Sequence, residues 1–348
     1  HASFAHFLDI ISYIIVSYEF IVVGQDSFIF FIFLICIVIV YLQSMTTIVQ
    51  NDLVWVEEEM NRKPVYQHPE GWNAGEWQEC WKGEYVDFTV DTWTRKNSEE
   101  QSRLAKAYKK WYAEQKGMAE ERSISKSGAV FEFTLIPPGK FWRGSPEGEK
   151  DKQSGETRHK VRISKAYYMQ KTEITQGQWR AVTGESPWSG QSYMENNDRH
   201  AAAYISWDDI KQKMLPKMGS EFGLPTEVQW EYACRAGTTT RFYWGESESE
   251  MGQYANSGCA EDGYKYIAPV GSLKPNGFGL CDMSGNVWEW CEDKYANYKG
   301  EEQVDPCNQE GSDCVYRGGF WNIRKEKKTD QVFVHEKHER HENERIFL

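Results

Sequence analysis

From residue 130 to its end, the chain alternates short strand-like runs with turns of Gly, Pro and Asn. Apolar residues recur at helical spacing in two stretches of this region, residues 176–182 and 207–214. The pattern predicts an irregular α+β domain with few long elements. Because the chain has 15 Trp and 28 Gly residues, we expect a loop-rich fold whose core contains large rings.

The chain is acidic, with 52 Asp and Glu residues against 40 Lys and Arg residues and a formal charge of −12. A protein of this charge has no general attraction for polyanions. We therefore expect no nucleic-acid partner and no electrostatic binding to anionic lipid. Eight Cys residues in 348 do not make a disulfide scaffold.

Residues 1–44 form an apolar segment that differs in composition from the rest of the chain. The first basic residue is Arg62, so the segment lacks the positive region that opens a secretory signal. Its uninterrupted apolar run, residues 28–42, is shorter than the roughly 20 residues that span a bilayer. An extension to residue 20 would bury Asp26 in lipid, at a cost of about 2.5–3.5 kcal/mol.

Three interpretations of this segment stay open. It is a membrane anchor through residues 20–42, an uncleaved signal-like segment, or a stretch that is not native translation. If the segment is genuine, we expect a membrane-anchored or extracytoplasmic protein. Otherwise we expect a cytoplasmic one.

The rest of the chain divides into three parts. Residues 45–97 are rich in Trp and contain an alternating stretch, residues 85–90, that predicts a strand. Residues 98–130 are predicted to form a helix and a linker, and residues 131–348 a domain.

The sequence contains signals for the beginning, the buried side and the end of the helix predicted in residues 98–130. Residues 98–101 have the pattern of a capping box, and Leu104, Tyr108 and Trp111 follow at helical spacing. We expect the helix to run to about Gly117 and to pack its aromatic side on the domain.

Residues 282–289, DMSGNVWE, place two carboxylates around a Gly-centred turn. Carboxylate oxygens are ligands that Ca²⁺ prefers, and its six to eight ligand positions require backbone carbonyls as well. The alternative is that Asp282 and Glu289 cap turns and accept hydrogen bonds from backbone N–H groups. The same two interpretations apply to the polar residues of the stretch 255–264.

Six ordered blocks resemble the formylglycine-generating enzyme family, also called the sulfatase-modifying-factor family. The blocks are FTLIPPGKFWRGSPEGE (133–149), YYMQKTEITQGQWRAVTG (167–184), AAYISWDDI (202–210), GLPTEVQWEYACRAG (223–237), FGLCDMSGNVWEW (278–290) and YRGGFWN (316–322). The resemblance implies a loop-rich α+β domain with little regular secondary structure, related to C-type lectins, over residues 131–348.

The resemblance also implies two calcium sites, each made of two side chains and two backbone carbonyls. The first would use the side chains of Asp282 and Glu289 and the carbonyls of Gly285 and Val287; the second would use the side chains of Asn256 and Asp262 and the carbonyls of Ser257 and Tyr264. Trp288 matches the family's pocket tryptophan. We expect a ligand surface that includes Phe320, Trp321 and Asn322.

The copper chemistry of the family depends on two cysteines that this chain lacks. Enzymes of the family hold Cu(I) between Cys residues four and nine positions past the Gly-Gly pair, and soft thiolates suit this ion. Counted from Gly319, these positions are Ile323 and Lys328, and the Ser that usually follows the Gly-Gly pair is Phe320. We therefore expect no copper in the chain as written.

The end of the chain departs from the family. Residues 324–345 are almost all Lys, Glu, Arg and His, where family members have an Arg-Ser-Ala-rich run and a final Gly-Phe-Arg strand. A solvated charged tail, a reading-frame fault after Asn322 and deliberate diversification each account for this, and we favour the frame fault. Upstream, Cys307 and Cys314 flank a Gly-containing loop and are either free or joined in a disulfide.

Three functions are consistent with the sequence. The first is a calcium-braced module without copper-oxidase activity that binds a protein, peptide or glycan. The second is an oxygen-dependent oxidoreductase of the formylglycine-generating type whose catalytic segment is altered. The third is a silent paralogue that pairs with an active enzyme. Fold alone does not choose among them.

Overall fold

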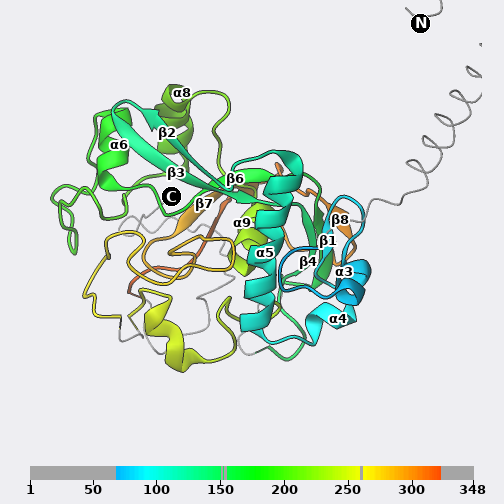
Figure 1. The fold of residues 1–348 in the computed structure, drawn as a ribbon. Helices are drawn as coiled ribbons and strands as arrows, with labels where there is room; N and C mark the ends of the chain where they lie inside the picture. The colour runs from blue at the N-terminus through cyan, green and yellow to red at the C-terminus, as the bar shows by residue number, and fades with distance from the viewer. Residues whose placement is uncertain (1–67, 150–151, 153–154, 259–261, 323–348) are drawn as a thin grey trace, which may run out of the picture. The chain divides into compact units, whose positions relative to one another are not determined.

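The computed structural model describes residues 68–149, 152, 155–258 and 262–322 (Figure 1). The described residues belong to one compact unit. The apolar segment of residues 1–44 and the copper positions Ile323 and Lys328 lie outside the described residues. Among the described residues, no helix is both long enough and apolar enough to span a bilayer.

The first long helix forms where the sequence predicts it. Helix α5 (Ser98–Lys116) ends at Gly117, whose φ of 61° is the left-handed conformation that glycine adopts readily. Its N-cap is Asn97 and not Ser98, because the Asn97 side chain accepts a hydrogen bond from Glu100 N. Ser98 Oγ instead donates to the carbonyl of Trp244. The predicted helix is confirmed, and the predicted capping residue is wrong by one position.

The buried side of α5 joins the Trp-rich region to the later chain. Leu104 and Tyr108 are fully buried, and Tyr108 Oη donates to the carbonyl of Pro138. Trp93 Nε1 donates to the carbonyl of Gly237 at 2.7 Å. Residues 68–130 therefore pack against the same core as residues 131–322, and the predicted packing of the aromatic side of α5 is confirmed.

The strand predicted over residues 85–90 is short. Strand β1 (Val86–Asp87) pairs with β4 (Gly139–Arg143), and then the chain bends. The bend has a local cause, since Asp87 Oδ1 accepts hydrogen bonds from both the N–H and the hydroxyl of Thr89. Helix α4 (Asp91–Thr94) follows, and helix α3 (Ala74–Cys80) precedes the strand.

Three small sheets form the β part of the domain. Their strand orders are β1-β4-β5-β8, β2-β3-β6 and β7-β9. The remaining strands are β2 (Glu121–Lys126), β3 (Ala129–Ile136), β5 (His159–Ile163), β6 (Tyr167–Gln170), β7 (Glu289–Lys294), β8 (Gln303–Val304) and β9 (Cys314–Arg317). Loops occupy much of the sequence between them, so the α+β, loop-rich prediction is confirmed.

Two later helical stretches match the prediction, and one was missed. Helix α6 (Gln176–Thr183) forms as predicted. The second stretch is α7 (Trp207–Asp209), a π-helical turn η1 (Ile210–Met214) and α8 (Leu215–Met218). Pro216 lacks an N–H to continue the α-helical ladder, which accounts for the change of register before it.

The missed helix is α9 (Glu227–Arg235), which begins at a capping box of Thr226 and Gln229. All but one of its residues are buried, and its charged residues Glu227, Glu231 and Arg235 form ion pairs in the interior and do not face solvent. Residues 227–232 also alternate polar and apolar side chains, which is the pattern of a strand. It contacts β4 and β5 on one side and β7 and β9 on the other (Figure 1). A short 3₁₀ helix, η2 (Glu248–Gln253), was also not predicted.

The core consists largely of aromatic rings. The fully buried tryptophans include Trp93, Trp179, Trp188, Trp230 and Trp290. The ring of Trp72 contacts those of Trp77 and Trp93, with centroids 5.2 and 5.1 Å apart. The predicted core of large rings is confirmed, and α9 lies at its centre.

Candidate functional site

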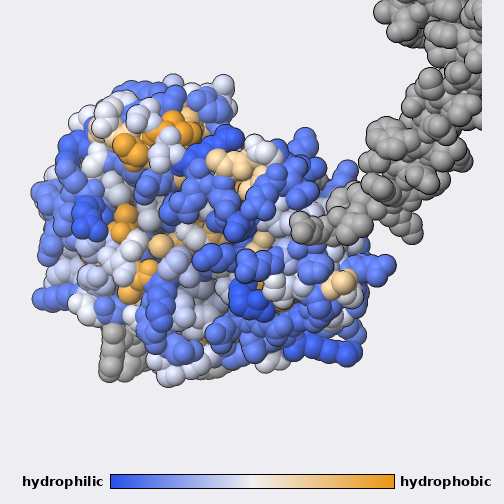
Figure 2. Space-filling model, viewed as in Figure 1, coloured by the Kyte–Doolittle hydropathy of each residue, from blue (hydrophilic) through white to orange (hydrophobic). Residues whose placement is uncertain are grey.

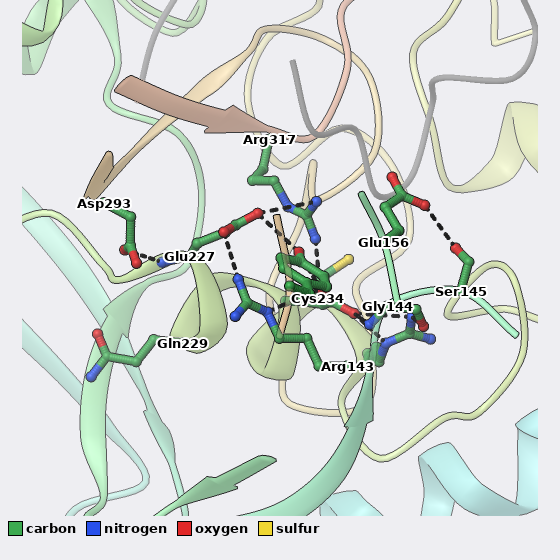
Figure 3. A network of polar contacts seen from close by, with 12 residues as sticks. Arg143, Gly144, Ser145, Glu156, Glu227, Gln229, Cys234, Asp293 and Arg317 are labelled. Carbon is green, nitrogen blue, oxygen red and sulfur yellow. Dashed lines mark hydrogen bonds and ion pairs between the residues drawn. The ribbon is translucent and has the colours of Figure 1, made fainter. Parts of the chain in front are cut away.

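A buried network of arginines and glutamates surrounds α9 (Figure 3). Arg143 Nη2 on β4 lies 2.5 Å from Glu227 Oε2, and Arg317 Nη2 on β9 lies 2.7 Å from Glu231 Oε2. The other oxygen of Glu231 accepts a hydrogen bond from the backbone N–H of Gly144. Asp293 on β7 accepts a hydrogen bond from the backbone N–H of Glu227. The network therefore joins two sheets to one helix.

Charges in this network compensate one another. Burial alone would raise the pKa of Glu231, but the guanidinium groups of Arg235, Arg317 and Arg143 hold it below its ordinary value. The buried charges of the network are paired with one another, and the pairs connect β4 and β9 to α9. We assign it a structural role.

The predicted first calcium set lies beside this network, in the loop that leads into β7. Asp282 and Asn286 have positive φ values of 61° and 63°, and Gly285 has a φ of 80°. A Cβ on Gly285 would lie 2.0 Å from the carbonyl oxygen of Asn256, so only glycine fits there. Such strained backbone is characteristic of ligand-binding loops.

Two of the predicted ligand oxygens converge on one point. Val287 O and Glu289 Oε1 lie 3.7 and 3.6 Å from the position that a Cβ on Gly318 would occupy. Glu289 Oε2 accepts a hydrogen bond from Trp230 Nε1 at 2.8 Å. Asp282 Oδ2 accepts one from the backbone N–H of Gly271 at 2.6 Å. Asp282 and Glu289 thus each accept one hydrogen bond, as the turn-capping interpretation expects. Each carboxylate also keeps oxygen lone pairs that are available to a metal ion.

The carboxyl groups of this loop have no cation beside them among the described residues. Burial raises the pKa of Asp282 to about 6 and that of Glu289 to about 8, where the negative charge of Asp282 adds to the effect. Glu173 is equally buried, and burial together with Asp282 and Glu289 raises its pKa well above the ordinary value. Hard oxygens without a counter-charge fit the requirements of Ca²⁺.

Glu173 is a residue of this site that the sequence did not single out. Its carboxylate accepts hydrogen bonds from Val287 N at 3.1 Å and from Asn286 Nδ2 at 2.8 Å. It fixes the loop from 113 and 114 positions away in the sequence. The block at 167–184 contains it, but a lone Glu after a strand carries no signal of such a role.

The predicted second set also comes together, in a turn. Asp262 Oδ2 accepts a hydrogen bond from Ser257 N, and Asp262 Oδ1 accepts one from Tyr264 N. The side chain of Asn256 donates to the carbonyl of Tyr266 and to Asn286 Oδ1. These bonds correspond to the turn-capping interpretation of Asp262.

Within the described residues, no three His, Cys, Asp or Glu side chains form a metal-binding group. The first set contains two carboxylates and depends on carbonyl oxygens for its other ligands. Because all of its ligands would be oxygen atoms, this set suits a hard cation such as Ca²⁺ and does not suit a soft metal such as Cu(I).

The predicted ligand surface lies against the same loop. Trp321 N donates to the carbonyl of Asn286 at 3.1 Å. We define the aromatic surface as the five side chains Tyr193, Tyr266, Trp288, Phe320 and Trp321. Successive ring centroids along it lie 5.2–6.4 Å apart. Tyr193 is 59% exposed, Trp288, Phe320 and Trp321 are half-buried, and Asn322 is exposed.

The described cysteines are free thiols. They are Cys80, Cys234, Cys281, Cys291, Cys307 and Cys314. Burial raises the pKa of Cys80 to about 12 and that of Cys281 to about 11, so these thiols stay protonated at neutral pH. Of the alternatives for Cys307 and Cys314, the structure has the free form: Cys314 accepts from Lys294 Nζ and Cys307 from Gln309 Nε2.

The domain combines short strands, a strained loop lined by oxygen atoms and an aromatic surface. These features agree with the family that the six sequence blocks resemble. Residues 119–346 match the family described as "Sulfatase-modifying factor enzyme 1-like domain". This match spans more than half of the chain, and the protein belongs to this family.

Several curated proteins share part of this sequence. The chain is 35% identical to mouse formylglycine-generating enzyme over 162 residues, which are 42% of this chain and 43% of that protein. It is 35% identical to the Streptomyces coelicolor enzyme over 159 residues, 41% of this chain and 50% of that protein. It is 39% identical to mouse inactive C-alpha-formylglycine-generating enzyme 2 over 129 residues, 35% of this chain and 34% of that protein. The chain thus spans half or less of the length of these relatives.

Solved structures have the same fold. Treponema denticola variable protein 1 superposes with a TM-score of 0.51 at 24% identity, covering 64% of this chain and 93% of that one. PvdO from Pseudomonas aeruginosa superposes with a TM-score of 0.50 at 27% identity, covering 57% of this chain and 86% of that one. The predicted family and fold class are confirmed.

Proposed function

We propose that this protein is a member of the sulfatase-modifying-factor family that binds a protein, peptide or glycan at its aromatic surface and does not carry out copper-dependent oxidation. The observation that carries the proposal is the pair Ile323 and Lys328, which stand where the copper-binding cysteines of the family's enzymes are expected. An aliphatic and an ammonium group do not bind Cu(I).

Two further observations support a binding role. Inactive relatives of the formylglycine-generating enzymes share the same family and 39% of their aligned residues with this chain. In the aromatic surface the ring of Trp321 contacts those of Tyr193 and Tyr266, and Tyr193 is 59% exposed, so rings in mutual contact reach the surface, where aromatic side chains often take part in recognition. Tyr193 and Trp321 offer ring faces for an apolar or sugar-ring partner.

We include calcium at the first predicted set in this proposal. Asp282, Glu289 and the carbonyls of Gly285 and Val287 would hold the ion, and Ca²⁺ would supply the positive charge that the buried carboxylates lack. Because Trp321 is hydrogen-bonded to Asn286 in the same loop, calcium would brace the aromatic surface. For Asp262 we favour the turn-capping role.

The test of the binding role compares ligand arrays with and without calcium. Purified protein is applied to glycan and peptide arrays in Ca²⁺ and in EGTA, beside the Trp321→Ala variant and a Trp142→Ala control on β4, outside the aromatic surface. We expect a set of ligands that binds in calcium and is lost with Trp321→Ala but kept with Trp142→Ala. Binding that survives Trp321→Ala unchanged would contradict the proposal.

The alternative is an oxidoreductase whose catalytic segment is altered in the sequence as written. It is favoured by the 35% identity to active formylglycine-generating enzymes. Translation of the nucleotide sequence after Asn322 in all three frames distinguishes the two. Two Cys codons at the family spacing, followed by Gly-Phe-Arg, would support the enzyme.

A further inference from the structure

A lysine and a cysteine face each other across the sheet β7-β9. Lys294 on β7 and Cys314 on β9 are register partners, and Lys294 Nζ donates a hydrogen bond to Cys314 Sγ at 3.0 Å. The backbone N–H of Lys294 donates to the carbonyl of Asn308. The next amide, Tyr295 N, donates to the carbonyl of Asp313, which precedes β9. Lys294 and Cys314 are therefore a non-hydrogen-bonded pair, the kind whose side chains lie closest in an antiparallel sheet.

The Lys294 side chain is held in place without an ion pair. Its Nζ lies 4.3 Å from the centre of the Trp207 ring, in a cation–π contact. Lys211 lies over the same ring at 5.0 Å, but its Nζ pairs with the Glu292 carboxylate at 2.8 Å. Among the described residues, no carboxylate pairs with Lys294. One of the two ammonium groups at this ring is thus neutralised, and the other is directed at sulfur.

The Cys314 side chain packs at the margin of a core cluster that also includes Trp179 of α6, Met218 of α8 and Phe131 of β3. Figure 2 shows hydrophobic residues at the surface where α6, α8 and the β2-β3 pair meet, on the outer side of this cluster. Cys314 itself is only partly buried, so a small oxidant has access to it. An apolar wall, a cation and contact with solvent therefore meet at this residue.

The other cysteine of this segment, Cys307, lies on the opposite side of β7. It is next to Asn308, which accepts a hydrogen bond from one edge of the strand, whereas Cys314 pairs with the other edge. Neighbouring strands are about 4.8 Å apart, so the two segments are about 9–10 Å apart across β7. A disulfide requires Cα atoms within about 7 Å of each other. The group within reach of the Cys314 sulfur is therefore the amine of Lys294.

We propose that Lys294 and Cys314 form a site of oxidative modification. Hydrogen peroxide converts the Cys314 thiol into a sulfenic acid, and the Lys294 amine condenses with it to a sulfenamide that cross-links β7 to β9. Sulfenic acids in proteins condense with nitrogen in this way. The thiolate is the reactive form of a cysteine, and a hydrogen bond from an ammonium group stabilises negative charge on its acceptor. The site shares no residue with the proposed calcium site or the aromatic surface.

The two steps balance with hydrogen peroxide as the oxidant. Sulfur attacks peroxide, so an S–O bond forms, the O–O bond breaks and one water leaves; sulfur loses two electrons and peroxide gains them. The Lys294 ammonium then gives a proton to solvent, and its nitrogen attacks the sulfur. The S–N bond forms as the S–O bond breaks, and the hydroxyl leaves with a proton from nitrogen as a second water. Because the two atoms already lie 3.0 Å apart, the chain does not have to rearrange.

The test is peptide mapping of the full chain by mass spectrometry, before and after treatment with a molar excess of hydrogen peroxide. The cross-linked pair has lost two hydrogen atoms. We therefore expect the tryptic peptides that contain Lys294 and Cys314 to be joined, at about 2 Da below the sum of their masses, and cleavage after Lys294 to be lost. Cys307→Ser removes the disulfide alternative and should leave the yield of joined peptide unchanged.

Two lysine variants test the role of the amine. Lys294→Arg keeps a cation beside Trp207 but replaces the amine by a guanidinium, which stays protonated in proteins. The cross-link should disappear in this variant, and the Cys314 sulfenic acid should be trapped by dimedone instead. Lys211→Arg is the matched control, because Lys211 lies over the same ring, and it should leave the cross-link unchanged.

Three results would overturn the proposal. The first is a peroxide-induced disulfide between Cys307 and Cys314. The second is a Cys314 that stays unmodified, or is oxidised further, without any joined peptide. The third is a joined peptide in Lys294→Arg at the yield of the unsubstituted protein. If Lys294→Arg fails to fold, the presence or absence of the joined peptide in Cys307→Ser still decides the question.

Discussion

Two neighbouring regions of this protein bury carboxylates in opposite ways. Around α9, Glu231 is surrounded by three arginines, which hold its pKa below the ordinary value despite burial. At the start of β7, where the preceding loop ends, burial raises the pKa of Glu289 to about 8. Among the described residues, no basic side chain pairs with Glu289. The α9 network is complete without a ligand, and the loop lacks a positive charge.

This difference distinguishes the α9 network, which stabilises the fold, from the loop before β7, which is suited to bind a ligand. A buried carboxylate with its own guanidinium groups stabilises the fold, and a buried carboxylate without them is suited to bind a cation. The aromatic surface is connected to the second region, the loop before β7, by the hydrogen bond from Trp321 N to the carbonyl of Asn286. Four measurements test the comparison.

The largest effect is expected for Arg317→Met. Arg317 is fully buried and lies 2.7 Å from Glu231 and 3.6 Å from Glu227. Its removal leaves a buried negative charge with less compensation, so the free energy of unfolding should fall by about 3–5 kcal/mol. Urea denaturation measures the change. The control is Arg95→Met, whose partner Asp91 is solvent-exposed, with an expected change of about 0–1 kcal/mol. Equal effects would remove the distinction between the buried network and a surface pair.

Calcium should act on the loop and not on the network. At a free concentration 100 times the dissociation constant, Ca²⁺ should stabilise the protein by about 2.7 kcal/mol, and EGTA should reverse this. Glu289→Gln should abolish the effect, since it removes a charged ligand. Arg317→Met should keep it. Thermal unfolding of the three proteins with and without Ca²⁺ makes the comparison, and a calcium effect that persists in Glu289→Gln contradicts the account.

The two regions should respond to pH with opposite sign in calcium-free protein. The lowered pKa of Glu231 gives stability that is present at neutral pH and is lost as the pH falls through the folded-state pKa. The raised pKa of Glu289 means that stability is lost as the pH rises from its ordinary value of 4.5 to about 8. Urea unfolding from about pH 2 to 9 measures both. Glu289→Gln should reduce only the second slope, to which Asp282 and Glu173 also contribute.

The smallest effect is expected at Asp262. Asp262→Ala removes the acceptor for two backbone N–H groups, so stability should fall by about 1 kcal/mol. If Asp262 caps a turn, calcium stoichiometry measured by isothermal titration should stay at one per chain. A decrease from two to one would instead assign it to a second calcium site.

The sequence predicted the parts of the fold that have local signals. Helix α5 was predicted because its aromatic residues recur at helical spacing and Gly117 ends it. Helix α9 was not, because residues 227–232 alternate polar and apolar side chains as a strand does, and its charged residues are paired in the interior. Strand β1 is shorter than the alternating stretch of residues 85–90, because the Asp87 side chain accepts hydrogen bonds from Thr89 and turns the chain. Alternation of polar and apolar residues gives no sign of this side-chain hydrogen bond.

The site was only partly predictable for a related reason. Asp282 and Glu289 are close in sequence, so the motif at 282–289 proposed them together, and the family resemblance added the carbonyls of Gly285 and Val287. Glu173 reaches the same loop from more than 100 residues away. A contact of that kind depends on the tertiary fold, as does the placement of Trp321 on Asn286.

The central claim is that this protein has the scaffold of its family without the copper chemistry. The most direct measurement combines the metal content of the purified full chain, loaded with Cu(I) and Ca²⁺ and then desalted, with oxygen consumption on a Cys-containing sulfatase peptide. We predict one Ca²⁺ per chain, no retained copper and no oxygen uptake above the peptide alone. Stoichiometric Cu(I) together with turnover of the peptide would contradict the account.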